Sequence, residues 1–320
     1  MTPPWAVRDL GHERVLVVDG VEHRTHYSER VVRMLVERKG PERAPLYFPF
    51  KATRGAHFLG RLVHYLAARG ARNLRVLEIG CSFGHVTEYL GEQPLIGSIV
   101  ALDVDRAFTE ITRAKVEDLR LAKVHAVLHL SEAAARALPF PDGAFDLVLV
   151  IGVVEHLPAS GRHCWVDEYY RVLAPGGHIA ILDTPNRAFP LETHSLGLPA
   201  VQWLPAPAAY RYARAFRRPV RAVPFDDFDR GAWRNASLRE CLPSTGIAGL
   251  VDVTEEAGYG WRFFRETARS RTRRALLPLF ALACGALRAI GRSPSLALPY
   301  FNLVLRRAST AGPTRRSPAR

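Results

Sequence analysis

The chain has 320 residues, and 48% of them are hydrophobic, which is ample for one folded core with extensions. Its formal net charge of +13 admits an anionic membrane, a nucleic acid or an acidic substrate as a partner, although an arginine-rich composition explains the charge equally well. The four cysteines are scattered without a C-x-x-C pair, which argues against a disulfide framework or a zinc site and favours a reducing cytosol.

Residues 1–70 are predicted to form an N-terminal extension. A hairpin is expected over residues 14–26, because two apolar runs flank the turn pair Asp19-Gly20. Ser28 can cap a helix that continues to Lys39, and a second helix is expected near residues 54–69. The N-terminus lacks a long apolar segment, so we expect no signal peptide.

Residues 76–90, with the sequence VLEIGCSFGHVTEYL, predict a buried strand, a glycine-containing turn and a helix. Gly80 and Gly84 permit tight turning and close approach of the backbone to a ligand. A second apolar run ends on Asp103, about 20 residues farther on, where a ribose-binding carboxylate is expected. The pair of features therefore predicts a nucleotide-type ligand.

Two details of this turn argue against NAD. Ser82 stands where the second glycine of G-x-G-x-x-G belongs, and the acidic Glu78 precedes the first glycine. A carboxylate repels a pyrophosphate but favours an ammonium or sulfonium group. S-adenosylmethionine (SAM) carries both of these positive groups and no phosphate, so SAM is the predicted cofactor.

The region from residue 71 to 307 is predicted to be one α/β domain with a Rossmann-like, doubly wound sheet. Strands are expected at 74–79, 98–103, 124–130, 145–151, 178–182, 249–255 and 300–306, and helices at 106–119, 162–173, 208–218 and 235–242. A ligand in such a sheet lies beyond the carboxyl ends of the strands. Residues 188–298 are predicted to be a largely helical insertion, and 308–320 a disordered basic tail.

Five segments carry a family resemblance, and they occur in the expected order between about residues 74 and 187. They are E-I-G-C-S-F-G, A-L-D-V-D, L-P-F-P-D-G-A-F-D-L-V-L-V, V-V-E-H-L and L-A-P-G-G-H-I-A-I-L. The chain thus resembles the class I SAM-dependent methyltransferases, in particular the branch that acts on small molecules and quinones. The resemblance implies SAM-dependent methyl transfer on a seven-stranded, mostly parallel sheet with an antiparallel last strand.

The resemblance also implies which residues bind the cofactor. The turn residues should lie against the aminoacid part of SAM, and Asp103 should accept both ribose hydroxyls. Glu132 either contacts the adenine or is a helix-capping partner for Ser131. The full implied set is Glu78, Gly80, Cys81, Ser82, Gly84, Asp103, Val104, Glu132, Ile151 and Gly152.

The segment after the fourth sheet strand contains the candidate catalytic residues Glu155 and His156. His156 is the best candidate base, since unperturbed histidine titrates near ~6.5, and its alternative is a histidine that braces the loop. His194 is a second polar candidate. In the quinone O-methyltransferase branch a Glu and a His at these positions help to bind a divalent metal. The additional acid three residues before the Glu is Gly152 here, so no metal is predicted.

A cluster of arginines between residues 262 and 274 precedes an uncharged run, 275–287, which is far shorter than the ~20 residues needed to span a bilayer. This pattern indicates either attachment to an anionic membrane surface or an insertion helix packed on the domain. We therefore expect a cytoplasmic protein, peripheral at the inner face of the membrane in the first case, with a small-molecule or lipid-like methyl acceptor.

Two other functions stay open. A nucleic-acid methyltransferase is disfavoured, because the chain has G-V-V-E-H-L where base methylation calls for an N/D-P-P-Y-type turn. A non-catalytic SAM-fold binding protein is disfavoured by the intact Glu78, Gly80, Gly84 and Asp103. The sequence predicts no oligomeric state.

Overall fold

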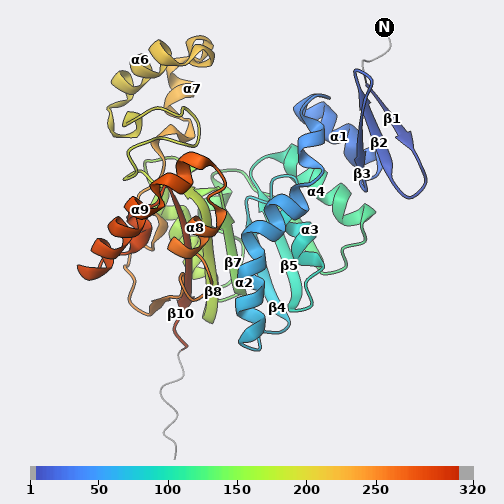
Figure 1. Ribbon diagram of the computed structural model, residues 1–320. Helices are drawn as coiled ribbons and strands as arrows, with labels where there is room; N and C mark the ends of the chain where they lie inside the picture. The colour runs from blue at the N-terminus through green and yellow to red at the C-terminus, as the bar shows by residue number, and fades with distance from the viewer. Residues whose placement is uncertain (1–4, 310–320) are drawn as a thin grey trace, which may run out of the picture. The chain divides into compact units, whose positions relative to one another are not determined.

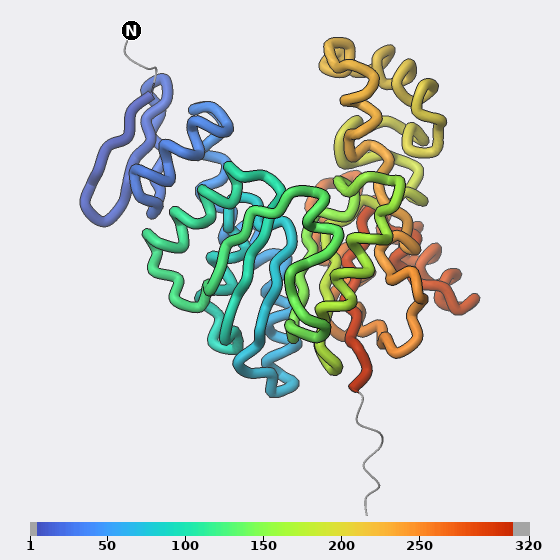
Figure 2. Tube along the Cα trace, turned by 180° about the vertical axis from the view of Figure 1, so that it is seen from behind, coloured from blue at the N-terminus to red at the C-terminus, as the bar shows by residue number. Residues whose placement is uncertain are grey.

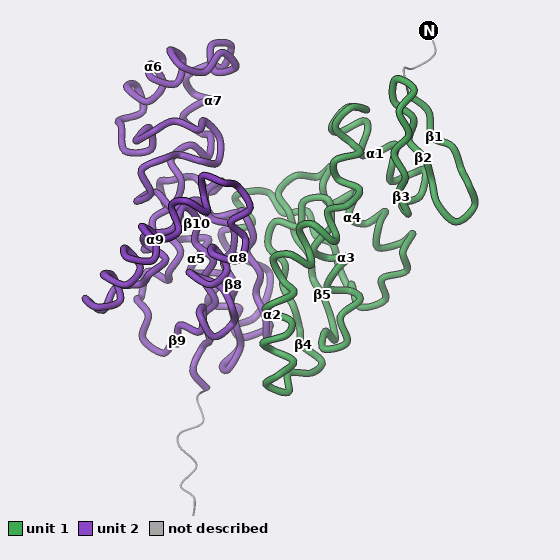
Figure 3. The backbone as a smooth tube through the Cα atoms, in the orientation of Figure 1, with its two compact units in different colours: residues 1–135 green, residues 136–320 purple. Residues whose placement is uncertain are grey.

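The computed structural model describes residues 5–309, which fall into two compact units, residues 1–135 and 136–320 (Figure 3). The predicted tail, residues 308–320, lies outside the described residues except for its first two positions. The fold is α/β, and its main sheet has seven strands in the order β6-β5-β4-β7-β8-β10-β9 (Figure 1). This order confirms the predicted fold class.

Unit 1 begins with a small antiparallel sheet that packs beside the first helix (Figure 2). The predicted hairpin is present, and Asp19 and Gly20 both have positive φ, which matches the twist of a two-residue turn. An additional strand pairs with it, which the sequence analysis missed. The elements are β1 (Trp5–Asp9), β2 (Arg14–Val18), β3 (Val21–Thr25) and α1 (Glu29–Lys39).

Helix α1 starts where the sequence predicts, because the Ser28 side chain accepts a hydrogen bond from the backbone N–H of Val31. The second predicted helix begins as a π-helix over Lys51–Ala56 and becomes α-helical in α2 (His57–Ala68). The remaining elements of the unit are the parallel strands β4 (Leu74–Ile79), β5 (Ile96–Asp103) and β6 (Val124–His129), with helices α3 (His85–Gly91) and α4 (Arg106–Asp118).

A buried polar network connects the N-terminal extension to α3 and α4. The Glu88 carboxylate accepts a hydrogen bond from the Tyr27 hydroxyl at 2.9 Å and lies 2.9 Å from Nε2 of His26. The ammonium of Lys115 is 3.6 Å from the same carboxylate. Burial lowers the pKa of Lys115 to about 8, and the charge of Glu88 partly offsets this. The extension is therefore fixed to the domain by hydrogen bonds to a buried carboxylate as well as by apolar packing.

Unit 2 contains the other four strands of the main sheet. Strand β7 (Phe145–Ile151) has the predicted bounds, whereas β8 (Leu173–Pro185) begins five residues before the predicted start because Pro175-Gly176-Gly177 is included with a shift of register. Strand β10 (Tyr300–Arg307) is antiparallel to β8 and to β9 (Leu250–Asp252), as predicted for the last strand.

The helices of unit 2 include several that the sequence analysis did not delimit. They are α5 (Arg162–Arg171), α6 (Ala206–Phe216), α7 (Phe225–Asp229), α8 (Trp261–Thr267) and α9 (Arg271–Ala289). The helix expected at 235–242 is a short 3-10 helix, Leu238–Cys241. All four cysteines are free thiols. Among residues 5–309, no helix has both the length and the apolar character that crossing a bilayer requires.

Candidate functional site

The glycine turn after β4 has a backbone conformation that explains its sequence. Gly80, Ser82 and Gly84 all have positive φ, at 74°, 48° and 68°. A Cβ added at Gly84 would lie only 2.8 Å from Cγ2 of Thr112, so this position needs glycine for space as well as for conformation. At Ser82, which replaces the second glycine of the dinucleotide fingerprint, the carbonyl accepts the Thr112 hydroxyl at 2.9 Å.

Asp103, at the end of β5, is bonded directly to this turn. Its Oδ2 accepts the backbone N–H of Ser82 at 2.8 Å, and its Oδ1 accepts the N–H of Asp105 at 2.9 Å. Burial raises the pKa of Asp103, and these two N–H groups partly offset the rise. Each carboxylate oxygen keeps further acceptor capacity, so the arrangement can still accept a diol.

A second acid near the turn, Asp105, has a structural role. Its side chain caps α4 through the N–H of Ala107 at 2.8 Å, and it pairs with Arg38 at 2.8 Å. The structure thus leaves Asp103, the predicted residue, as the better candidate for the ribose. Val104, next in the chain, is 46% exposed.

Glu78 is buried beneath the turn, where the Thr87 hydroxyl donates to it at 2.6 Å. Burial raises the pKa of Glu78 to about 8, and the nearby Asp103 adds to the rise. An added ammonium group would reverse this effect, because it stabilises the carboxylate.

Two amides of the turn already have protein partners. The N–H groups of Gly80 and Cys81 both donate to the Leu102 carbonyl, at 2.8 and 3.0 Å. The Cys81 side chain is buried against Ala101 and Val127, and its thiol lies 3.8 Å from the Thr112 hydroxyl. At these two positions, therefore, a ligand can approach the backbone closely, but the N–H groups are already hydrogen-bonded within the protein.

Glu132 is exposed and has no hydrogen-bond partner among the described residues. The 3-10 helix Ala134–Arg136 is capped by Ser131 alone, whose hydroxyl accepts the N–H of Ala134 at 3.2 Å. The capping alternative for Glu132 is therefore not observed, and its contact with adenine stays a prediction.

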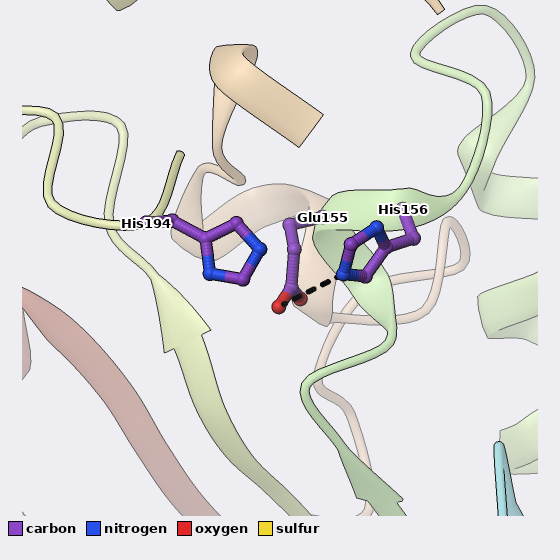
Figure 4. A group of neighbouring side chains, drawn as sticks. All are labelled: Glu155, His156 and His194. Carbon is purple, nitrogen blue, oxygen red and sulfur yellow. Dashed lines mark ion pairs between the residues drawn. The ribbon is translucent and has the colours of Figure 1, made fainter. Parts of the chain in front are cut away.

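In unit 2, three of the predicted polar residues lie together on two loops. Glu155 and His156 belong to a 3-10 helix, Val154–His156, that follows β7, which ends at Ile151, and the loop residue Gly152. His194 comes from the loop after β8. Figure 4 shows the Glu155 carboxylate between the two imidazole rings, whose centroids are 5.2 Å apart. The Glu155 Oε1 atom is 4.0 Å from Nε2 of His156.

The electrostatics of this cluster, defined as Glu155, His156 and His194, are set by burial. Glu155 is 2% exposed, and burial raises its pKa to about 8, with a further rise from Asp183. Partial burial lowers the pKa of His156 well below its usual range, and the charges of His194 and Arg162 act in the same direction. His156 is therefore neutral at neutral pH.

Two residues that the sequence analysis missed hold these loops. The buried Arg162 donates to the carbonyls of Leu157 at 3.0 Å and Glu155 at 3.4 Å. Glu192, also buried, accepts four consecutive backbone N–H groups, from residue 194 to 197, at 2.5 to 3.1 Å. The signal for the second was a Glu directly before a Thr-His-Ser-Leu-Gly loop, where a carboxylate can bond the backbone locally.

The central part of the chain is similar to known proteins. Residues 77–181 match the family described as a methyltransferase domain. A demethylmenaquinone methyltransferase from Listeria monocytogenes is 27% identical over 198 residues, which cover 60% of this chain and 73% of that protein. A probable S-adenosylmethionine-dependent methyltransferase from Mycolicibacterium smegmatis is 33% identical over 129 residues, covering 40% of this chain and 42% of that protein.

Among solved structures, a putative methyltransferase from Bacillus halodurans is 27% identical with a TM-score of 0.32. The alignment covers 39% of this chain and 51% of that one.

Proposed function

Because this chain is a class I SAM-dependent methyltransferase with SAM as its cofactor, we propose that it methylates an oxygen or nitrogen atom of a small, lipid-like acceptor. The observation that carries the proposal is the cluster of Glu155, His156 and His194, in which a neutral imidazole lies beside a buried carboxyl group. An acceptor hydroxyl or ammonium group must lose a proton, whereas the sulfonium of SAM needs no activation.

The chemistry is an in-line displacement at the methyl carbon. The bond from sulfur to the methyl group breaks with its electron pair left on sulfur, and the acceptor atom forms the new bond to carbon. The acceptor proton passes to His156. Alignment of the two reactants supplies most of the rate, and effective molarities correspond to about 7–11 kcal/mol.

Two observations support a lipid-like acceptor. The Listeria relative is named for demethylmenaquinone, a quinone. In this chain, α9 presents an exposed apolar stripe, in which Leu279 is 64% exposed and Leu282 is 72% exposed. We propose that this stripe enters an anionic lipid surface, where a hydrophobic acceptor resides.

Helix α9 has two distinct faces. Its inner face packs through Phe280, whose ring centroid is 4.7 Å from that of Phe264, and through the buried Cys284. Its outer face bears the leucines, and the exposed Arg271, Arg273 and Arg274 occupy its first turn. An amphipathic helix of this kind combines apolar insertion with attraction of arginine to anionic headgroups.

Vesicle co-sedimentation tests the membrane part of the proposal. The chain should bind phosphatidylcholine vesicles that contain phosphatidylglycerol, and salt should weaken this binding. The double variant Leu279→Ser/Leu282→Ser should bind at least about 10-fold less, because burial of two leucines is worth more than one 1.4 kcal/mol step. Leu46→Ser, at an equally exposed leucine of unit 1, is the control. Equal binding to neutral vesicles at all salt concentrations would refute attachment through charge.

Labelling with methyl-tritiated SAM tests the methyl transfer. Incubation with a cell extract should place protein-dependent label in the organic-soluble fraction, and His156→Ala should reduce it by about 10²-fold or more, the scale for a general base. Label found in nucleic acid would contradict the proposed acceptor class.

A further inference from the structure

The Glu155 carboxylate is buried without a hydrogen-bond partner. The residue is 2% exposed, and neither Oε1 nor Oε2 has a donor within hydrogen-bond distance in the described structure. The nearest arginine, Arg162, directs its guanidinium to backbone carbonyls and to Glu240 instead. A buried polar group without a partner is costly, so such a group in a folded protein calls for an explanation.

Two imidazoles lie on either side of this carboxylate (Figure 4). One ligand atom each from Glu155, His156 and His194 can be chosen so that all lie within 4.8 Å of one another. Zinc-type bonds of about 2.1 Å in a tetrahedral arrangement separate ligand atoms by about 3.4 Å. Coordination therefore requires these atoms to move closer together, and both histidine side chains are exposed.

We propose that Glu155, His156 and His194 bind one divalent transition-metal ion. Two imidazole nitrogens and one carboxylate oxygen suit Zn²⁺, Co²⁺, Fe²⁺ or Mn²⁺ better than Mg²⁺ or Ca²⁺, which favour oxygen ligands. Three protein ligands leave a position of the ion open to a non-protein ligand, as in catalytic sites.

Neighbouring residues fix the backbone that carries Glu155 and His194, as a metal site requires of its ligands. Arg162 fixes the backbone at Glu155, and Glu192 fixes the loop that carries His194 through the N–H of His194 itself at 2.8 Å. Gly152 also leaves the space beside the carboxylate open, because a Cβ added there would lie 3.6 Å from Glu155 Oε1. The sequence pattern had excluded a metal at this point because Gly152 replaces an acid, and it could not show that His194 joins the set.

This inference deepens the proposed function but does not depend on the identity of the acceptor. A bound divalent cation acidifies a hydroxyl that coordinates it and orients it. With the ion bound, His156 would act as a ligand, and its proposed role as the base would apply only to the metal-free chain. Metal binding and SAM binding are measured separately, so the failure of one leaves the other standing.

Titration of the tag-free, metal-stripped chain with Co²⁺ tests the proposal. One equivalent should bind with visible d–d absorption of a four- or five-coordinate ion, and Zn²⁺ should abolish this absorption by displacing the Co²⁺, whereas Mg²⁺ should not. Absence of visible absorption, or displacement by Mg²⁺, would overturn the proposal.

Three variants identify the ligands. Glu155→Gln preserves the shape of the side chain and should weaken Co²⁺ binding by at least about 10-fold to 100-fold, the scale for residues that only support a metal ligand, and His194→Ala should do the same. His64→Ala, at an exposed histidine of α2, should bind Co²⁺ like the parent chain. Circular dichroism and SAM titration confirm that each variant is folded. Unchanged Co²⁺ affinity in both Glu155→Gln and His194→Ala would place the ion elsewhere and overturn the assignment.

Discussion

The Glu192 carboxylate accepts the backbone N–H of His194 at 2.8 Å, and the same carboxylate bonds the next three N–H groups of that loop. The position of His194 is thus determined by a buried acid two residues earlier in the chain. A further hydrogen bond, from the Thr193 hydroxyl to that of Tyr300 at 3.0 Å, ties the loop to β10.

Glu192→Ala should therefore destabilise the chain and displace His194. Loss of the acceptor leaves buried N–H groups unsatisfied, so the free energy of unfolding should fall by at least about 1–3 kcal/mol. Urea unfolding measures the stability, and the NMR resonance of the His194 ring reports its environment. Glu192→Gln, which keeps one acceptor oxygen, should have a smaller effect on both. An unchanged urea midpoint together with an unchanged His194 resonance would show that the carboxylate does not position the loop.

Gly84→Ala should cost more stability than Gly70→Ala. Both glycines have positive φ, at 68° and 75°, but only at Gly84 does an added Cβ meet another atom, Cγ2 of Thr112 at 2.8 Å. The conformational cost of about 1–2 kcal/mol is common to both variants, and the clash adds to it only at Gly84. Adding Thr112→Ser, which removes Cγ2 and keeps the hydroxyl, should recover part of the loss. Equal unfolding free energies for the two alanine variants would contradict the packing of the turn against α4.

Glu88→Gln should lower the free energy of unfolding by about 3–5 kcal/mol, because it leaves the buried Lys115 without its counter-ion. Adding Lys115→Met to the same chain should restore part of this stability, since no uncompensated charge then remains. Chemical denaturation of the four chains gives the coupling energy between the two sites. If the double variant were as unstable as the sum of the two single variants, the buried pair would not be coupled.

Glu78 should make the stability of the cofactor-free chain depend on pH. Burial raises its pKa from 4.5 to about 8, so between these values the folded chain keeps a proton that the unfolded chain has lost. The contribution of this residue to the free energy of unfolding therefore falls as pH rises through that window. Glu78→Gln cannot titrate, so its stability relative to the parent should increase from about pH 5 to about pH 8. A difference that stays constant over this range would mean that the carboxyl group is ionised in the folded chain.

The sequence predicted those parts of the fold that local patterns determine. The bounds of β4 and β7 follow from predominantly apolar runs, and Ser28 caps α1 through a local hydrogen bond. The start of β8 was wrong, because Pro175-Gly176-Gly177 reads as a turn although the sheet accommodates it with a shift of register. Pairing partners, and not local propensity, decided that boundary.

The candidate site was only partly predictable for the same reason. Glu155, His156 and His194 could each be selected by residue type, but the last two are 38 positions apart, and no pattern shows that they meet. Arg162 and Glu192 were missed because they form hydrogen bonds with backbone groups. Every residue has a backbone, so such partners leave no pattern in the sequence. The orphaned oxygens of Glu155 are visible only once its surroundings are known.

Calorimetric titration with SAM tests the central claim most directly, namely that the turn from Gly80 to Gly84 and the carboxylate of Asp103 receive this cofactor. The parent chain should bind SAM at one site and should not bind NAD. Asp103→Ala should weaken SAM binding by about 1.5–3 kcal/mol, the scale for hydrogen bonds to a charged group. Asp105→Ala is the matched control, and it should lower stability while leaving SAM affinity unchanged, because Asp105 caps α4. The same SAM affinity in Asp103→Ala as in the parent chain, or tight binding of NAD, would contradict the account.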